Sequence, residues 1–158
     1  MINGYNVYDQ SSEYTVHKPF ETFTAGKYVV TALPAKHIPE ENCFIYLVRE
    51  GDKTLLYATD TGYFKRSVFD YFVKNGIKLD AMIVDSTYGL VCSSDKAHMN
   101  FFDNDELRKE LMSLGIIDEK TQCYLTHIFH GAAKDLDLLE KAVPEGYTLL
   151  RDGYTFTI

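Results

Sequence analysis

Three residues that can bind a metal ion each follow a segment that reads as a β-strand. They are His37 after residues 28–33, Asp60 after residues 54–59, and His127 after residues 123–125. Strand carboxyl ends gather ligands in α/β sheets, and two imidazoles with a carboxylate suit zinc, manganese or iron. The alternative is three unrelated strand-end residues, with the histidines hydrogen-bonded and Asp60 capping a turn. Spacing alone favours this alternative, because no pair forms a short diagnostic motif.

The segments that must position these residues begin with β-strands. Residues 28–33, 43–48 and 54–59 are rich in β-branched and aromatic side chains, and the turn-forming residues 50–53 predict a hairpin between the last two. After Gly62 the apolar residues recur at helical spacing, with Ser67 as a possible N-cap and Gly76 as a stop.

Helices and strands then alternate. Residues 81–84 form an apolar run typical of a strand covered on both faces. Asp103 and Glu106 have capping-box spacing ahead of a helix that Gly115 closes, residues 123–125 form the next strand, and Pro144 stops a third helix. Residues 148–150 and 155–158 predict a final hairpin. This order predicts an α+β or α/β fold, a mixed sheet with helices on one face.

Length and composition set the class of protein. The 158 residues fit one domain, with residues 1–23 as a lead-in loop and edge strand before residues 24–158. A net charge of -7 without a long basic run argues against nucleic acid as a partner. No apolar stretch is long enough for a membrane span and no signal peptide is evident, which predicts a cytoplasmic protein. Three cysteines without CxxC spacing predict reduced core thiols.

Five short motifs in order along residues 14–158 resemble the metallo-β-lactamase superfamily. They are Leu33-Pro-Ala-Lys-His37, Leu56-Tyr-Ala-Thr-Asp60-Thr-Gly62, Met82-Ile-Val-Asp-Ser86, Leu125-Thr-His127-Ile-Phe-His130 and Arg151-Asp-Gly153. Within it, the sequence is most similar to phosphodiesterases of the phosphoribosyl cyclic phosphate type. The resemblance implies zinc or manganese as cofactor, His37 and His127 as ligands, Asp60 as a ligand that bridges two metal ions, and His98 near the substrate phosphate.

The sequence departs from this superfamily at its principal metal motif. The string His-x-His-x-Asp-His, which belongs to the N-terminal half of the αββα sandwich, does not occur. The chain therefore resembles only the C-terminal half. Four donors of the dinuclear site are missing, so the chain by itself cannot build the two-metal centre that activates a water and clamps a phosphoryl group.

Two further residues are candidates for the same site. His130 lies three residues after His127 and would either join it at a metal or phosphate or act as a structural hydrogen-bond donor. Asp85, with Ser86 beside it, would either orient a ligand histidine or cap the turn that follows its strand.

Two hypotheses of function follow. The first is a phosphodiesterase-like metal-dependent hydrolase, present as a C-terminal half that is inactive alone and acts on a small phosphodiester once an N-terminal half is supplied. The second is a non-catalytic remnant that serves as an oligomeric interaction module. Both leave an apolar sheet face to be covered, which predicts a homodimer or a complex with an N-terminal half-domain. Metal content separates them.

Overall fold

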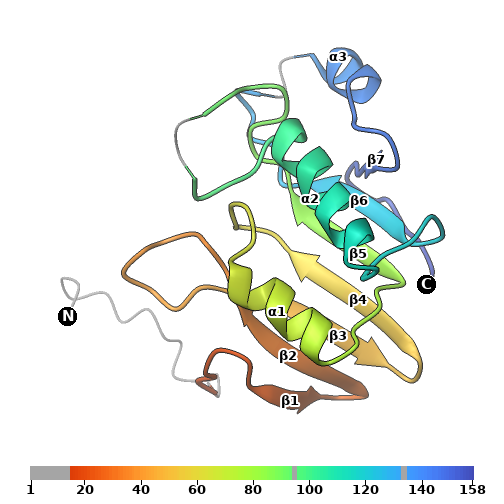
Figure 1. The fold of residues 1–158 in the computed structure, drawn as a ribbon. Helices are drawn as coiled ribbons and strands as arrows, with labels where there is room; N and C mark the ends of the chain where they lie inside the picture. The colour runs from red at the N-terminus through yellow and green to blue at the C-terminus, as the bar shows by residue number, and fades with distance from the viewer. Residues whose placement is uncertain (1–14, 94–95, 133–134) are drawn as a thin grey trace.

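The computed structural model describes residues 15–93, 96–132 and 135–158, and it shows one mixed sheet flanked by helices (Figure 1). Within these residues the sheet has seven strands in the order β1 to β7, the same as along the chain. The strands are β1 (Thr22–Ala25), β2 (Tyr28–Pro34), β3 (Phe44–Glu50), β4 (Lys53–Ala58), β5 (Ala81–Asp85), β6 (Gln122–Thr126) and β7 (Thr148–Leu149), and the helices are α1 (Arg66–Lys74), α2 (Phe101–Ser113) and α3 (Leu136–Lys141). Of the predicted lead-in, residues 1–14 lie outside the described residues.

The sheet has an antiparallel and a parallel part. Strands β1 to β4 pair antiparallel, and the predicted hairpin between β3 and β4 is confirmed, with Glu50 opposite Lys53. From β4 to β7 each pair is parallel, and α1 and α2 are the crossovers on either side of β5. All five residues of β5 are buried, as a strand covered on both faces requires.

Helices α1 and α2 cover one face of this sheet. Leu47, Leu56, Met82 and Cys123 stand side by side across strands β3 to β6, so their side chains share a face. They belong to one buried cluster with residues of both helices, including Phe72 of α1. The predicted mixed sheet with helices on one face is confirmed.

Both predicted helix starts differ from the observed ones. Helix α1 begins at Arg66 after Lys65, which makes no side-chain cap, so Ser67 is not its N-cap. Helix α2 is capped by Asn100, which accepts from the Asp103 amide at 2.9 Å, so the capping box lies earlier than predicted. The reason is that Phe101 is 3% exposed and extends the helix into the core. No helix among the described residues is long and apolar enough to cross a membrane.

The predicted C-terminal hairpin is wrong. Strand β7 pairs only with β6, in parallel, and residues 155–158 form no strand. The tail instead lies against the sheet, where Phe156 packs on Tyr124 with ring centroids 4.4 Å apart and Gln122 donates to the Thr157 carbonyl at 2.9 Å. A two-residue edge strand offers few hydrogen bonds, whereas the aromatic tail buries apolar surface here.

The sheet face opposite α1 and α2 carries exposed aromatic side chains. Tyr46, Tyr57, Ile83 and Tyr124 stand in one row across β3 to β6. Tyr57 is 43% exposed and Tyr46 36%, although both lie in the interior of the sheet. We call this surface the open face.

The cysteines are free thiols in different environments. Cys123 is buried, and burial raises its pKa to about 11, which keeps it protonated and unreactive at neutral pH. Cys43 is half-buried and Cys92 is exposed. The prediction of core thiols therefore holds for Cys123 and is wrong for Cys92.

Candidate metal centre

The three residues predicted from strand ends lie in one cluster. His37 follows β2, Asp60 follows β4 and His127 follows β6, so all three lie at the same end of the strands, where β2, β4 and β6 reach their carboxyl ends. One carboxylate oxygen of Asp60 is 3.3 Å from Nε2 of His127 and 4.0 Å from Nε2 of His37. The alternative, in which strand-end residues point to unrelated places, does not describe this structure.

Two members of the cluster have a strained backbone. Asp60 has φ of 51° and His127 has φ of 67°, in the left-handed region that residues with a side chain rarely adopt. Such a conformation costs on the order of 1 to 3 kcal/mol and is concentrated at functional sites. Here it turns both side chains toward each other at the ends of β4 and β6.

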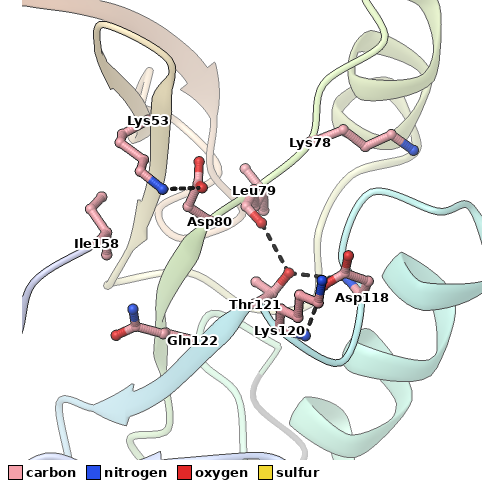
Figure 2. Close-up of a pocket in the computed structure, with 9 residues that line it drawn as sticks. All are labelled: Lys53, Lys78, Leu79, Asp80, Asp118, Lys120, Thr121, Gln122 and Ile158. Carbon is pink, nitrogen blue, oxygen red and sulfur yellow. Dashed lines mark hydrogen bonds and ion pairs between the residues drawn. The ribbon is translucent and has the colours of Figure 1, made fainter.

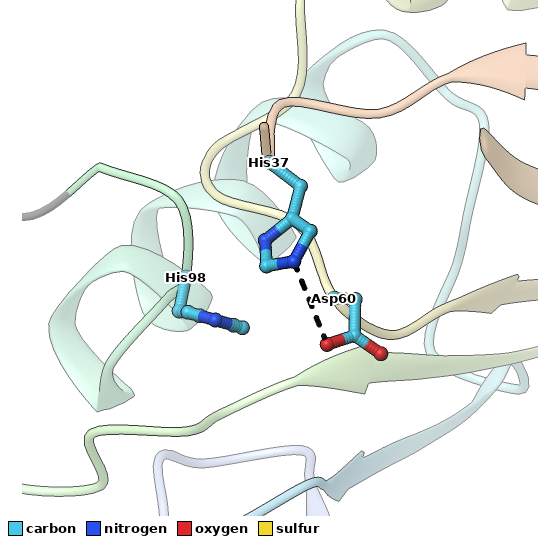
Figure 3. A group of neighbouring side chains, drawn as sticks. All are labelled: His37, Asp60 and His98. Atoms are coloured by element: carbon cyan, nitrogen blue, oxygen red, sulfur yellow. Dashed lines mark ion pairs between the residues drawn. The ribbon is translucent and has the colours of Figure 1, made fainter. Parts of the chain in front are cut away.

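His98 joins the cluster from the loop ahead of α2. Its ring centroid lies 4.8 Å from that of His37 and 5.6 Å from that of His127, on which it stacks. A donor atom of His98 lies within 4.8 Å of donor atoms of His37 and Asp60. Figure 3 shows these three side chains reaching from separate segments toward a common space.

Asp85 lies directly behind two of the histidines and is fully buried. One carboxylate oxygen accepts the amides of Thr87 at 2.9 Å and Met99 at 3.1 Å. The other oxygen is 2.8 Å from Nδ1 of His98 and 3.4 Å from Nδ1 of His127. Asp85 therefore does both things that its position suggested, since it caps the turn and contacts the histidines.

Thr87 is a contact that sequence reasoning missed. Its hydroxyl lies 3.0 Å from Nδ1 of His98 and 2.8 Å from Nδ1 of His127. Ser86, in contrast, accepts from Asn104 of α2 at 2.9 Å. His130 is exposed, and no contact among the described residues joins it to the cluster. The only available signal for Thr87 was its place two residues after Asp85.

The loops that carry the cluster are tied together. The Gly62 amide donates to the Lys36 carbonyl at 2.8 Å, and the Lys36 amide donates to the Thr61 hydroxyl at 3.0 Å. Nδ1 of His37 is 3.4 Å from the Ala97 carbonyl. The turn after Asp60, the His37 loop and the His98 loop thus form one packed unit.

Replacing Gly62 with alanine is expected to separate these loops. A Cβ atom there would collide with the Lys96 carbonyl, which is backbone and cannot rotate away. We expect a loss of about 1 to 3 kcal/mol in the free energy of unfolding, measured with urea, and weaker zinc binding. Gly26→Ala is the control for zinc binding: its φ of 61° strains any side chain, so the variant should lose stability, but its Cβ meets open space far from the cluster and zinc affinity should stay at the wild-type value. A Gly62→Ala chain with wild-type stability and zinc affinity would contradict this packing.

The donor set fits a divalent cation. Ligands about 2.1 Å from a tetrahedral zinc lie about 3.4 Å from one another. Nε2 of His127 and Nε2 of His37 lie 3.3 and 4.0 Å from the Asp60 oxygen. Among the described residues, the sets of three whose donor atoms all lie within 4.8 Å of one another are His37, Asp60 and His98, and Asp85, His98 and His127, so a cation bound by His37, Asp60 and His127 requires the two histidines to move closer together. Two imidazoles and one carboxylate, with a remaining position open, form the ligand pattern of catalytic rather than structural zinc sites.

A pocket of about 360 Å³ lies at the other end of the parallel strands (Figure 2). Two of its charges are paired, because Lys53 contacts Asp80 at 3.1 Å, and Lys78 points away to the Gly115 carbonyl. The Thr54 amide, more than Lys53, lowers the pKa of Asp80. The Thr121 hydroxyl donates to the Leu79 carbonyl and accepts from the Asp118 amide. These contacts join the loops at this end of the sheet.

Comparisons with solved structures identify the fold. The chain is similar to the metallo-β-lactamase fold protein YhfI from Bacillus subtilis, with 23% identity and a TM-score of 0.66 over 93% of this chain and 56% of that one. It is also similar to unliganded yeast PDE1, with 13% identity and a TM-score of 0.62 over 87% of this chain and 48% of that one. A third similar structure is zinc-bound PqqB from Methylobacterium extorquens, with 14% identity and a TM-score of 0.54 over 91% of this chain and 55% of that one. No protein-family model and no curated protein matches the sequence.

These likenesses confirm the fold that the sequence motifs predicted, while the phosphodiesterase type stays a prediction. The overall fold is shared although only 23% of the aligned residues are identical to YhfI. The chain has the metallo-β-lactamase fold and spans about half the length of the similar proteins.

Proposed function

We propose that this chain supplies the C-terminal half of the active site of a metal-dependent hydrolase, with His37, Asp60 and His127 as ligands of one divalent cation. The observation that carries the proposal is the convergence of two imidazoles on one oxygen of Asp60, maintained by strained backbone at Asp60 and His127. Zinc and manganese are the cations that the donor set and the sequence resemblance favour.

The residues of the chain then have distinct roles. A cation held by the three ligands would supply Lewis-acid polarisation and a lowered pKa for a water molecule. Asp85 holds His98 through Nδ1, so the other ring nitrogen remains available to an oxygen of the substrate. A small phosphodiester is the substrate class that we propose, with His98 contacting its phosphate.

A second polypeptide segment would complete this site. The chain covers only 56% of the length of YhfI, and the His-x-His-x-Asp-His string is absent from the sequence. Three protein ligands with an open position suit one cation, but a two-metal clamp needs further donors. We propose that an N-terminal half-domain provides them.

The isolated chain is therefore expected to be inactive. It should hydrolyse bis-p-nitrophenyl phosphate no faster than buffer with the same zinc or manganese, because the clamp on the phosphoryl group cannot be completed. Steady-state release of nitrophenol measures this. Metal-dependent turnover that Asp60→Ala abolishes would overturn the expectation, and would mean that a second copy or other residues provide the missing donors.

The open face is the surface that a partner would cover. It presents Tyr46 and Tyr57 to water in the middle of the sheet. The C-terminal tail packs on Tyr124, and its Phe156 and Ile158 line a pocket with Val48 and Leu55 of the same face. At about 25 cal/mol per Å², a few hundred Å² of exposed apolar surface forgoes several kcal/mol, which is comparable with the stability of a small domain. We propose a homodimer or a complex with an N-terminal half-domain through this face.

Association is expected to depend on the open face. Sedimentation equilibrium at micromolar concentration should show a dimer of the purified chain, and Tyr57→Lys should shift it to monomer. Val73→Lys is the matched control, because Val73 is 56% exposed but lies on α1, on the other side of the sheet. A well-folded monomer at these concentrations would contradict the proposal for the isolated chain.

The exposed apolar face also favours the second hypothesis, a non-catalytic interaction module. In that case the chain would associate as above while His37, Asp60 and His127 bound no stoichiometric metal. Metal analysis of the associated protein after dialysis against zinc distinguishes the two functions.

A further inference from the structure

We infer that Thr87 is a positioning residue that sets the ring of His127 beside His98, which Asp85 holds, with both rings protonated at Nδ1, so that both Nε2 atoms are available to a ligand. Its hydroxyl lies 3.0 Å from one Nδ1 and 2.8 Å from the other. The inference concerns the rings themselves. Only its consequence for metal affinity rests on the proposed function.

The proton assignment begins with Asp85. This carboxylate has no exposed surface, and one of its oxygens already accepts two backbone amides. A buried carboxylate needs hydrogen-bond donors around it, because its charge has lost the stabilisation of water. The second oxygen lies 2.8 Å from Nδ1 of His98 and 3.4 Å from Nδ1 of His127. Protons on both Nδ1 atoms satisfy it best.

The two histidines depend on Thr87 to different degrees. His98 has the buried carboxylate at 2.8 Å, which is a full charge-assisted hydrogen bond without any help. For His127 the carboxylate is at 3.4 Å, and the Thr87 hydroxyl at 2.8 Å is the short contact. Thr87 therefore accepts a hydrogen bond from the Nδ1–H group of His127 and orients its ring, whereas Asp85 mainly orients His98.

This arrangement has a consequence at the other side of the His127 ring. With the proton on Nδ1, the Nε2 lone pair faces the Asp60 carboxylate oxygen 3.3 Å away. Two acceptors so close repel each other unless a cation lies between them. Thr87 thus prepares His127 for a cation from a position that cannot itself touch one.

The test is a histidine ring ¹⁵N spectrum of the full-length chain without metal, at a pH where the imidazoles are neutral. In wild type, His98 and His127 should both show a protonated Nδ1. The isosteric Thr87→Val should move the ring shifts of His127 toward a mixture of tautomers and leave those of His98 in place, while Thr87→Ser should restore the wild-type pattern. Thr126→Val, which alters the residue before His127 in the chain, is the matched control and should change neither ring.

Two results would overturn the inference: a protonated Nε2 on His127 in wild type, or unchanged His127 shifts in Thr87→Val. Backbone amide spectra of each variant confirm that it is folded. Titration with zinc provides the separate readout, and Thr87→Val should bind it about 10- to 100-fold more weakly. If wild type binds no zinc while the ring shifts behave as expected, the proposed function fails and the role of Thr87 stands.

Discussion

Replacing Asp85 with alanine is expected to lower the free energy of unfolding by about 3 to 5 kcal/mol, measured by urea denaturation. The variant would leave the amides of Thr87 and Met99 without their acceptor in a site with no exposure to water. Each unsatisfied buried donor costs about 1 to 3 kcal/mol, and removing one partner of a buried pair adds to this. Nδ1 of His98 would also lose its carboxylate.

Asp85→Asn separates the two roles of this residue. The amide oxygen can still accept the two backbone N–H groups, so most of the stability should return. The side chain no longer carries the charge that favours protonated Nδ1 atoms, so zinc affinity should remain below wild type. Equal stability of wild type and Asp85→Ala would contradict the role of Asp85 as the buried acceptor of this turn.

Replacing Asp60 with glycine is expected to have opposite effects on stability and on metal binding. Asp60 adopts φ of 51° at an exposed position, and glycine populates this region without steric cost. We therefore expect the metal-free variant to be at least as stable as wild type, with a gain of up to about 1 kcal/mol. Zinc affinity, measured by calorimetric titration, should fall at least about 100-fold because the central carboxylate is lost.

The matched control for Asp60→Gly is Asp52→Gly, in the turn between β3 and β4 and far from the cluster. It should leave zinc binding unchanged. Zinc should also raise the melting temperature of wild type, since it binds only the folded chain, and should not raise that of Asp60→Gly. A variant that keeps the wild-type zinc affinity would show that Asp60 is not the centre of the cluster.

The convergence of His37, Asp60 and His127 was predictable from strand order. Strand β5 lies between β4 and β6 and runs parallel to both, so residues just beyond β4 and β6 meet at one edge. Strand β2 is antiparallel to β3, which is antiparallel to β4, so β2 ends at that same edge. Apolar runs and turn signals were enough to infer these strands.

The hydrogen bonds behind the histidines were not predictable in the same way. A threonine hydroxyl after a strand most often satisfies a local turn, and nothing in the sequence says that Thr87 instead meets His127, 40 positions further along the chain. The role of Asn100 as the N-cap of α2 was not predicted for a similar reason, because the start of this helix depends on the burial of Phe101. Such contacts depend on tertiary packing rather than on local propensity.

Predicting the C-terminal hairpin failed because alternation alone does not specify a partner. Residues 154–158 alternate apolar and threonine side chains, as a strand would, but β7 has only two residues with which to pair. The apolar surface around Tyr124 competes for the same tail. Whether the tail pairs with β7 or packs on the surface around Tyr124 could be decided only once the open face was known.

The most direct test of the metal centre is a crystal structure of the full chain grown or soaked with zinc, with data collected at the zinc absorption edge. The account predicts one anomalous peak about 2.0 to 2.2 Å from side-chain atoms of His37, Asp60 and His127. An anomalous map with no peak among these residues, although the crystal contains zinc elsewhere, would contradict it.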